Sequence, residues 1–368
     1  MKHIMINYYV LWKKNNEMLV SYLDKYYYLL LERLKEIISD DIYNEIISKV
    51  NNKDFIINWD ISSLINRLLE LKNHNFPDED NVQSILNNEI NIFLNWDDST
   101  LISKQWKNIW NTDIKITLHD VNPYAKFDAH PDHKVNWGIV WWWEKTEDEW
   151  IDIYTKTFNL LKIVDEGFYD ELNTIIQKII PLWTSQNLHN SASHKPCIGH
   201  LYMWYTLWVD QPELSNLEAI IHESSHNKLH LLFQFDKIIL NSMEENYYSP
   251  FRPDARHLKG VFLAIHAFVP TIYILMKAYE NGNIKSEHWL EKIVLYYIKN
   301  KITYKVLTKY ADFSELGEDI MKEVYYVMKL TDNVFKSLNI EKNIISNAIE
   351  REKTHFAEVN KNYPNFKY

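Results

Sequence analysis

The chain has 368 residues, 46% of them apolar, which is enough for one large domain or two smaller ones. Its formal net charge of -10 argues against a nucleic-acid partner, because phosphate contacts need a basic surface. The single cysteine, Cys197, excludes an intramolecular disulfide and a cysteine-rich zinc site, and it suits a reducing compartment. No apolar run is long enough for a signal peptide or a membrane span, so we expect a soluble cytoplasmic protein with no membrane partner.

Glycine and proline are scarce, at 6 and 10 residues. A sheet with many tight turns needs more glycine, so long helices are the better expectation. Glycine-rich phosphate loops are absent, which weighs against nucleotide binding. Up to about residue 112, apolar residues recur at helical spacing, as in SYLDKYYYLLLERLKEIIS (residues 21–39).

The middle of the chain is more mixed. Its β-branched and aromatic residues predict strands in DIKITLHDV (113–121), GIVWWW (138–143) and CIGHLYMWYT (197–206). We therefore predict a mainly α fold, a multi-helix domain with a small mixed α/β segment in the middle. Residues 1–112 would be a helical N-terminal region and residues 113–368 the functional domain, together one compact unit.

Two features of this middle segment favour ordinary structural explanations. His130, Asp132 and His133 could bind a metal, but three such residues in a polar loop are more often a solvated turn. The aromatic run from Trp137 to Trp143 could line a groove for an extended peptide, yet a core strand with buried aromatic faces is the better expectation.

The stretch IHESSHNKLH (residues 221–230) is the most informative. Upstream, Ser215 and Glu218 form a capping box that predicts a helix start. The apolar residues that follow predict that this helix runs to about Leu240.

His222 and His226 are one turn apart on this helix and point the same way, so two imidazoles can bind one divalent ion. Glu223 lies beside them, as in the His-Glu-x-x-His motif. His230 is rotated away from His222 and lies too far along the axis to share the same ion. We therefore predict a metal pair with His230 as a flanking residue.

A metal with two histidines needs a third ligand, and one candidate is Glu245. Eighteen residues separate it from His226, as in zinc peptidases in which Glu223 would be the general base. The residues around Glu245 are polar and break at Ser249-Pro250, which indicates a helix end rather than an inward-facing ligand.

The other candidate is His266, within the apolar stretch HLKGVFLAIHAFVPTIYILMKAYE (residues 257–280). It is the only strongly polar side chain between Gly260 and Pro270, and a buried polar group needs a partner. Pro270 removes the helix partner of the His266 carbonyl, so a local kink is expected there. These observations favour His266 as the third ligand.

Three blocks of the chain resemble a known family: SASHKPCIGHLYM (191–203), LEAIIHESSHNKLHLL (217–232) and YYSPFRPDARHLKGVFLAIHAFV (247–269). In this order they are similar to the HExxH-type Fe(II)/2-oxoglutarate-dependent peptide β-hydroxylases, the HExxH-motif peptide-modification proteins of ribosomal peptide pathways. The resemblance covers about 80 residues, and the combination is more specific than the motif alone.

The resemblance implies a dioxygenase that uses Fe(II), 2-oxoglutarate and O2. Through a ferryl intermediate it would hydroxylate a side-chain β-carbon in a ribosomally made precursor peptide and release succinate and CO2. His222, His226 and His266 would ligate iron, with Glu223 as a catalytic-site residue that orients a ligand or bound water. Many iron oxygenases use two histidines and a carboxylate, so Glu245 or Glu223 stays open as the anionic ligand.

The same resemblance gives a role to SPFRPDAR (residues 249–256). The distal carboxylate of 2-oxoglutarate needs a fixed, forked cation, which arginine supplies better than lysine. Arg256 is our first candidate and Arg252 the second, against pairing of either with Asp254. Ser191 and Ser193 would contact substrate or cofactor.

Two other functions remain open. One is a zinc-dependent metallopeptidase or hydrolase, with Glu223 as general base and Glu245 as third ligand. The other is a non-catalytic peptide-binding scaffold that keeps the helices without the chemistry. A peptidase needs no arginine to bind a keto acid. A role for Arg252 or Arg256 in binding one would therefore favour the oxygenase over the zinc peptidase.

Overall fold

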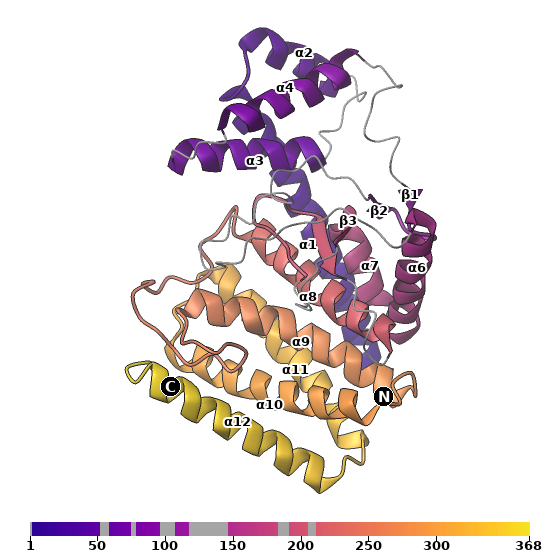
Figure 1. Cartoon of the computed structure of the whole chain (residues 1–368), viewed down its shortest axis with the longest axis vertical. Coiled ribbons are helices and arrows are strands. Elements are labelled where there is room, and N and C mark those ends of the chain that lie inside the picture. Colours follow the sequence, from indigo (N-terminus) through magenta and orange to yellow (C-terminus); the bar gives the residue numbers. More distant parts are fainter. Residues whose placement is uncertain are drawn as a thin grey trace. The chain divides into compact units, whose positions relative to one another are not determined.

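A computed structural model of the chain describes residues 2–51, 59–74, 79–95, 107–117, 146–182, 191–204 and 211–368. Within these ranges the chain forms 11 helices and one small four-stranded sheet, so the predicted mainly helical fold with a mixed middle segment is confirmed (Figure 1). The chain divides into two compact units. Unit 1 is Met1–Asn159 with Gly167–Leu231, and unit 2 is Leu160–Glu166 with Leu232–Tyr368.

Several predicted features lie outside the described residues. They include the loop with His130, Asp132 and His133 and the aromatic run from Trp137 to Trp143. The division into two units does not test the predicted boundary after residue 112, which concerns where the functional domain begins.

Unit 1 begins with four helices, which are α1 (Lys2–Lys35), α2 (Asp40–Asn51), α3 (Trp59–His74) and α4 (Glu79–Asn95). α1 packs on α2 and α3, and α3 packs on α4. The apolar residues of α3 recur every three or four positions and are fully buried, which explains why it is the central helix of this group: Ile61, Leu64, Ile65, Leu68 and Leu71.

The sheet of unit 1 has the order β1 (Lys107–Asn108), β2 (Lys115–Ile116), β3 (Lys178–Leu182) and β4 (His200–Trp204). β1 pairs antiparallel with β2, whereas β2–β3 and β3–β4 are parallel. Consecutive apolar residues are buried in the two longer strands, Ile179 and Ile180 in β3 and Leu201, Tyr202 and Met203 in β4, as expected for parallel strands. The strands predicted within 113–121 and 197–206 therefore exist, although the described part of each is shorter.

Three helices complete the elements around this sheet: α6 (Glu147–Val164), α7 (Glu166–Ile175) and α8 (Pro212–Leu232). A buried ion pair joins two of them, because the Lys228 ammonium of α8 lies 3.0 Å from the Glu171 carboxylate of α7. Both side chains are 6% exposed, so this contact fixes α8 to α7 in a region where an unpaired charge would be costly.

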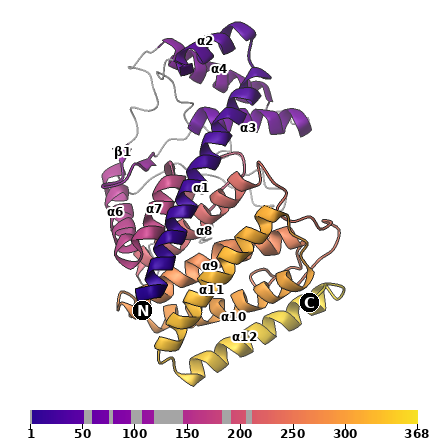
Figure 2. The same cartoon turned by 180° about the vertical axis from the view of Figure 1, so that it is seen from behind.

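Unit 2 contains α9 (Leu258–Glu280), α10 (Glu287–Tyr310), α11 (Glu315–Ser337) and α12 (Lys342–Asn362). α9, α10 and α12 run side by side, and α11 crosses the other face of α9, as the two opposite views show (Figures 1 and 2).

α9 is long and apolar enough to cross a membrane by length and composition, so the expectation that no segment passes that test was wrong. However, 78% of its most apolar window is buried inside the molecule. Burial on this scale is what the core helix of a soluble protein shows, and α9 has that place in unit 2.

The first turns of α9 and α11 have the same construction. His257 caps α9 by accepting a hydrogen bond from the Gly260 N–H, and Ser314 caps α11 by accepting one from the Gly317 N–H. The two glycines differ in their surroundings. A Cβ at residue 317 would overlap the carbonyl oxygen of Ile238, whereas one at residue 260 would make only ordinary contacts.

We predict that Gly317→Ala lowers the free energy of unfolding by about 1–3 kcal/mol, because the Ile238 backbone would have to move. Gly260→Ala is the matched control and should be neutral or stabilising by less than about 1 kcal/mol, since alanine restricts the unfolded chain. Denaturant unfolding of both variants measures the difference. Equal effects of the two substitutions would contradict this account of the packing.

Candidate metal site

The motif helix α8 has different ends from those predicted. It begins at Pro212, which suits a first helical turn because its missing N–H needs no partner there. Ser215 is therefore inside the helix and is not its cap. The helix ends at Leu232 rather than near Leu240. Beyond it, Ile238 has a φ of 62° and is buried in an irregular segment, so its apolar character did not mean a longer helix.

The two motif histidines face each other across one turn of α8. Their Nε2 atoms are 3.0 Å apart and their ring planes are nearly perpendicular, at 89°. Two nitrogen ligands about 2.1 Å from one ion and at right angles to each other would be about 3.0 Å apart, so this spacing fits neighbouring positions on a single metal. It also fits a hydrogen bond between two neutral rings.

Both rings are held in the neutral form that a metal needs. Burial lowers the pKa of His226 to about 4, and burial together with His226 lowers the pKa of His222 well below its ordinary value. Protons therefore do not compete for both nitrogens near neutral pH. Nδ1 of His226 is buried without a hydrogen-bond partner among the described residues, whereas metal-bound histidines usually donate from that nitrogen.

Glu223 is fixed by the segment that precedes β4. Its Oε2 accepts a 2.7 Å hydrogen bond from the Ser193 hydroxyl. Burial raises the pKa of this carboxyl to about 7, and the hydrogen bonds from Ser193 oppose that rise. Ser193 therefore has a defined contact within the protein. Among the described residues, Ser191 has no corresponding side-chain hydrogen bond.

Sequence reasoning missed Asn227, which attaches the motif helix to the sheet. Its Oδ1 accepts from the Gly199 N–H at 2.8 Å, and its Nδ2 donates to the His200 carbonyl at 3.0 Å. Gly199 has a φ of 86°, so the turn that presents these groups favours glycine. A signal was present, because Asn227 follows Glu223 by one turn on a helix side with buried neighbours.

His230, the flanking histidine, lies next to the pair, with its ring centroid 6.3 Å from that of His226. No cluster of three His, Cys, Asp or Glu side chains that could hold a metal occurs among the described residues of unit 1. A metal bound by the pair would therefore need a further ligand. Both candidates, Glu245 and His266, belong to unit 2.

Glu245 is exposed in the segment between α8 and α9. Its carboxylate forms an ion pair with Lys367 at 2.5 Å and accepts a hydrogen bond from the Tyr247 hydroxyl. These contacts lower the pKa of Glu245, and the contact with Lys367 has the larger effect. Glu245 is thus already paired at the surface of its unit, which is a poor arrangement for a metal ligand.

His266 is on α9 and is 6% exposed, as expected for a polar group in an apolar helix. α9 continues through Pro270 to Glu280 and does not end at the proline. The neighbouring Phe262 ring is 6.4 Å from the imidazole, centroid to centroid. The assignment of His266 as third ligand stays a prediction from the sequence.

The two candidate arginines flank one carboxylate. Arg256 Nε is 2.7 Å from one oxygen of Asp254, and Arg252 Nε is 3.7 Å from the other. Among the described residues, neither guanidinium has another side-chain partner. Pairing with Asp254, the alternative to a cofactor role, is therefore present, and each guanidinium makes it through its Nε atom.

No protein-family model matches the chain, and no curated protein is similar enough to match it. The resemblance to peptide hydroxylases therefore depends on the residues of the three blocks and on the chemistry that their contacts allow.

We predict that the His pair binds a divalent ion. His222→Ala and His226→Ala should each reduce bound Fe(II) or Co(II) by at least about tenfold, because one remaining imidazole gives a weak site. His230→Ala is the matched control on the same helix and should keep the wild-type metal content. Elemental analysis after anaerobic loading and desalting measures this. Full metal content in both the His222 and the His226 variant would show that the two rings are joined by a hydrogen bond and do not bind the metal.

Proposed function

We propose that the chain is an Fe(II)- and 2-oxoglutarate-dependent hydroxylase of a ribosomally made precursor peptide, acting in the cytoplasm. One oxygen atom of O2 would enter a C–H bond at a side-chain β-carbon, giving the alcohol. The other would enter 2-oxoglutarate as it loses CO2 and becomes succinate. Bound iron supplies the activation of O2, and His222, His226 and His266 would hold it.

The His pair supports a metal-dependent reaction. Its nitrogens face one another at the spacing of neighbouring ligands, and its rings are neutral. The same spacing also fits a hydrogen bond between the two rings. The pair is therefore compatible with a bound metal, and two histidines by themselves do not distinguish iron from zinc.

The observation that carries the choice of an oxygenase is the arginine pair around Asp254. Two guanidiniums and one carboxylate leave a net charge of +1, and both arginine side chains are partly exposed, at 48% for Arg252 and 26% for Arg256, so they could take a second carboxylate. α9 begins at Leu258, two residues after Arg256, and a helix N-terminus also favours an anion. A dicarboxylate co-substrate uses such a group, whereas peptide hydrolysis does not need one.

The contacts of Glu245 weigh against the zinc peptidase. That function requires this carboxylate as the third ligand, but it is paired with Lys367 at the protein surface. Glu223 would also have to hold the attacking water as general base. Its Oε2 is instead bonded to Ser193, which suits a residue that positions its neighbours.

We predict that the anaerobically Fe(II)-loaded protein converts 2-oxoglutarate to succinate when O2 is admitted. If a reading frame beside its gene encodes a precursor peptide, the protein should add one oxygen atom to that peptide per modification. His222→Ala and His266→Ala should abolish both products, because each removes a proposed ligand, and Glu245→Ala should retain both. Mass spectrometry of peptide and succinate measures the outcome.

Three results would contradict this proposal in different ways. Peptide cleavage that depends on zinc and not on 2-oxoglutarate would indicate the hydrolase. Wild-type protein that binds no metal would indicate the scaffold. Loss of hydroxylation in Glu245→Ala with normal activity in His266→Ala would make the third ligand a carboxylate.

Arg256→Ala should raise the KM for 2-oxoglutarate by about tenfold or more, since a charge-assisted bidentate contact is lost. Arg256→Lys should recover little of it, because lysine cannot form the planar fork. Arg252→Ala is the companion variant and should have a smaller effect. Steady-state kinetics with varied 2-oxoglutarate measures all three. A large effect of Arg252→Ala alone would transfer the role to Arg252.

A further inference from the structure

Residues 249–256, called the arginine loop here, are held at both ends by backbone hydrogen bonds. The Tyr247 and Arg256 backbones exchange two hydrogen bonds of 2.7 and 2.9 Å, which close the loop. On the other side, the Tyr248 N–H donates to the carbonyl of Lys367 at 3.0 Å. The ends are therefore fixed, but these contacts do not define the conformation between them.

An aromatic contact fixes the tip of the arginine loop to the helices. The Phe251 ring stacks on Phe268 of α9, with centroids 3.9 Å apart and planes at 6°. Tyr296 of α10 meets the same ring edge-on at 5.5 Å. The residue directly before Arg252 is thus anchored in the apolar layer between two helices.

A polar cluster of Tyr248, Lys299, Glu352 and His355 holds the same loop from α10 and α12. The Lys299 ammonium donates to the Pro250 carbonyl at 2.6 Å and lies 3.8 Å from Oε2 of Glu352. Oε1 of Glu352 accepts from the Tyr248 hydroxyl at 2.7 Å. Nδ1 of His355 is 2.8 Å from that hydroxyl.

Burying the charged and polar groups of this cluster costs free energy, which is unusual for an incidental contact. Glu352 is 4% exposed and Tyr248 is fully buried. Burial raises the pKa of Glu352 and lowers the pKa of Lys299, in each case against the attraction of the other. Oε2 of Glu352 has no hydrogen-bond partner among the described residues, so Lys299 is what compensates its charge.

The hydrogen bonds require one proton more than the Tyr248 hydroxyl supplies. That hydroxyl has a single proton but two partners, Glu352 and His355, within bonding distance. The second proton must therefore be on the carboxyl of Glu352 or on Nδ1 of His355. The Arg252 backbone raises the pKa of His355, against the larger lowering by burial, so His355 also lies beside the arginine loop.

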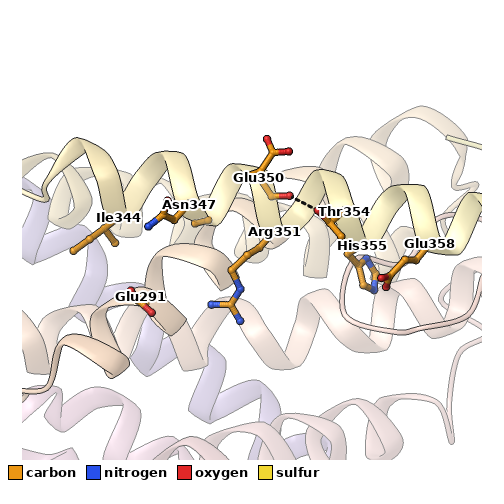
Figure 3. Close-up of a pocket in the computed structure, with 9 residues that line it drawn as sticks. Glu291, Ile344, Asn347, Glu350, Arg351, Thr354, His355 and Glu358 are labelled. Carbon is orange, nitrogen blue, oxygen red and sulfur yellow. Dashed lines mark hydrogen bonds between the residues drawn. The ribbon is translucent and has the colours of Figure 1, made fainter.

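His355 connects the cluster to solvent. It is half-buried and lines a surface hollow of about 570 Å³ along α12, near Arg351 and Glu358 (Figure 3). Lys299 and Glu352 are more buried, at 13% and 6% side-chain exposure. The cluster thus reaches from this hollow to the backbone of the arginine loop without involving either guanidinium.

We propose that Lys299, Glu352, which pairs with it, and His355, which meets Glu352 at the Tyr248 hydroxyl, are positioning residues that hold the arginine loop in the conformation that presents Arg252 and Arg256 to a dicarboxylate. The part of this proposal that concerns the dicarboxylate rests on the proposed function. The part that concerns the loop rests on contacts within unit 2 alone. An experiment can therefore test the two parts separately.

The rate of trypsin cleavage within the arginine loop measures how firmly the loop is held. Trypsin does not cut before proline, so Arg252–Pro253 is resistant and Arg256–His257 is the reporter bond. Cleavage at the exposed Lys329 on α11 corrects for global unfolding. Lys299→Met and Glu352→Leu should raise the ratio of the two cleavage rates by about tenfold, because each removes one of the cluster's contacts.

Two controls separate positioning from general stability. Glu352→Gln can donate to the Tyr248 oxygen and let the hydroxyl serve His355, so its cleavage ratio should stay within about twofold of wild type. Lys301→Met removes a lysine of α10 that pairs with Asp332, away from the loop, and should behave likewise. Unchanged ratios in Lys299→Met and Glu352→Leu would overturn the proposal.

The second readout is calorimetric binding of 2-oxoglutarate to the anaerobic Fe(II) protein, followed by kinetics. Lys299→Met should weaken binding and raise KM by about five- to tenfold, with kcat changed less than about twofold. Faster loop cleavage with unchanged affinity would overturn the link between loop and dicarboxylate. Wild-type protein that binds no 2-oxoglutarate would overturn the proposed function as well, and the cleavage ratios would still report on the loop.

Discussion

The site depends on keeping two imidazoles neutral and facing each other on one turn of α8. Helical spacing brings His222 and His226 to the same side, but spacing alone leaves their protons and ring rotations free. Burial lowers the pKa of both, and the Nε2 atoms meet at 3.0 Å. The arrangement fits neighbouring ligands on one ion, and it is the feature that connects the fold of unit 1 to the proposed metal-dependent reaction.

The surroundings of the pair are built to hold α8 in place. Asn227 bonds it to Gly199 and His200 at the start of β4, Lys228 bonds it to Glu171 of α7, and Glu223 accepts a hydrogen bond from Ser193. Each of these residues is adjacent or next to adjacent to a motif histidine, so the same short stretch supplies the proposed ligands and their supports. A rigid supporting layer of this kind is what positions ligand groups within a few tenths of an ångström.

The sequence was sufficient for the helical class and the histidine pair, since apolar periodicity and a one-turn spacing are local properties. It failed where tertiary contacts decide. α8 ends at Leu232, although apolar residues continue to the buried, non-helical Ile238, and the helical position of Asn227 indicated burial but not its contacts with Gly199 and His200. The anchoring of the arginine loop by Lys299 and Glu352 also joins residues about 50 and 100 positions away, which no motif could indicate.

The most direct test of the central claim is a crystal structure of the anaerobic Fe(II) complex with 2-oxoglutarate, with the metal located by anomalous scattering at the iron edge. This account predicts an iron peak between the Nε2 atoms of His222 and His226, His266 as the third protein ligand, and the distal carboxylate of 2-oxoglutarate on Arg256. A metal coordinated by Glu245 in place of His266, or a keto acid bound away from both arginines, would contradict it.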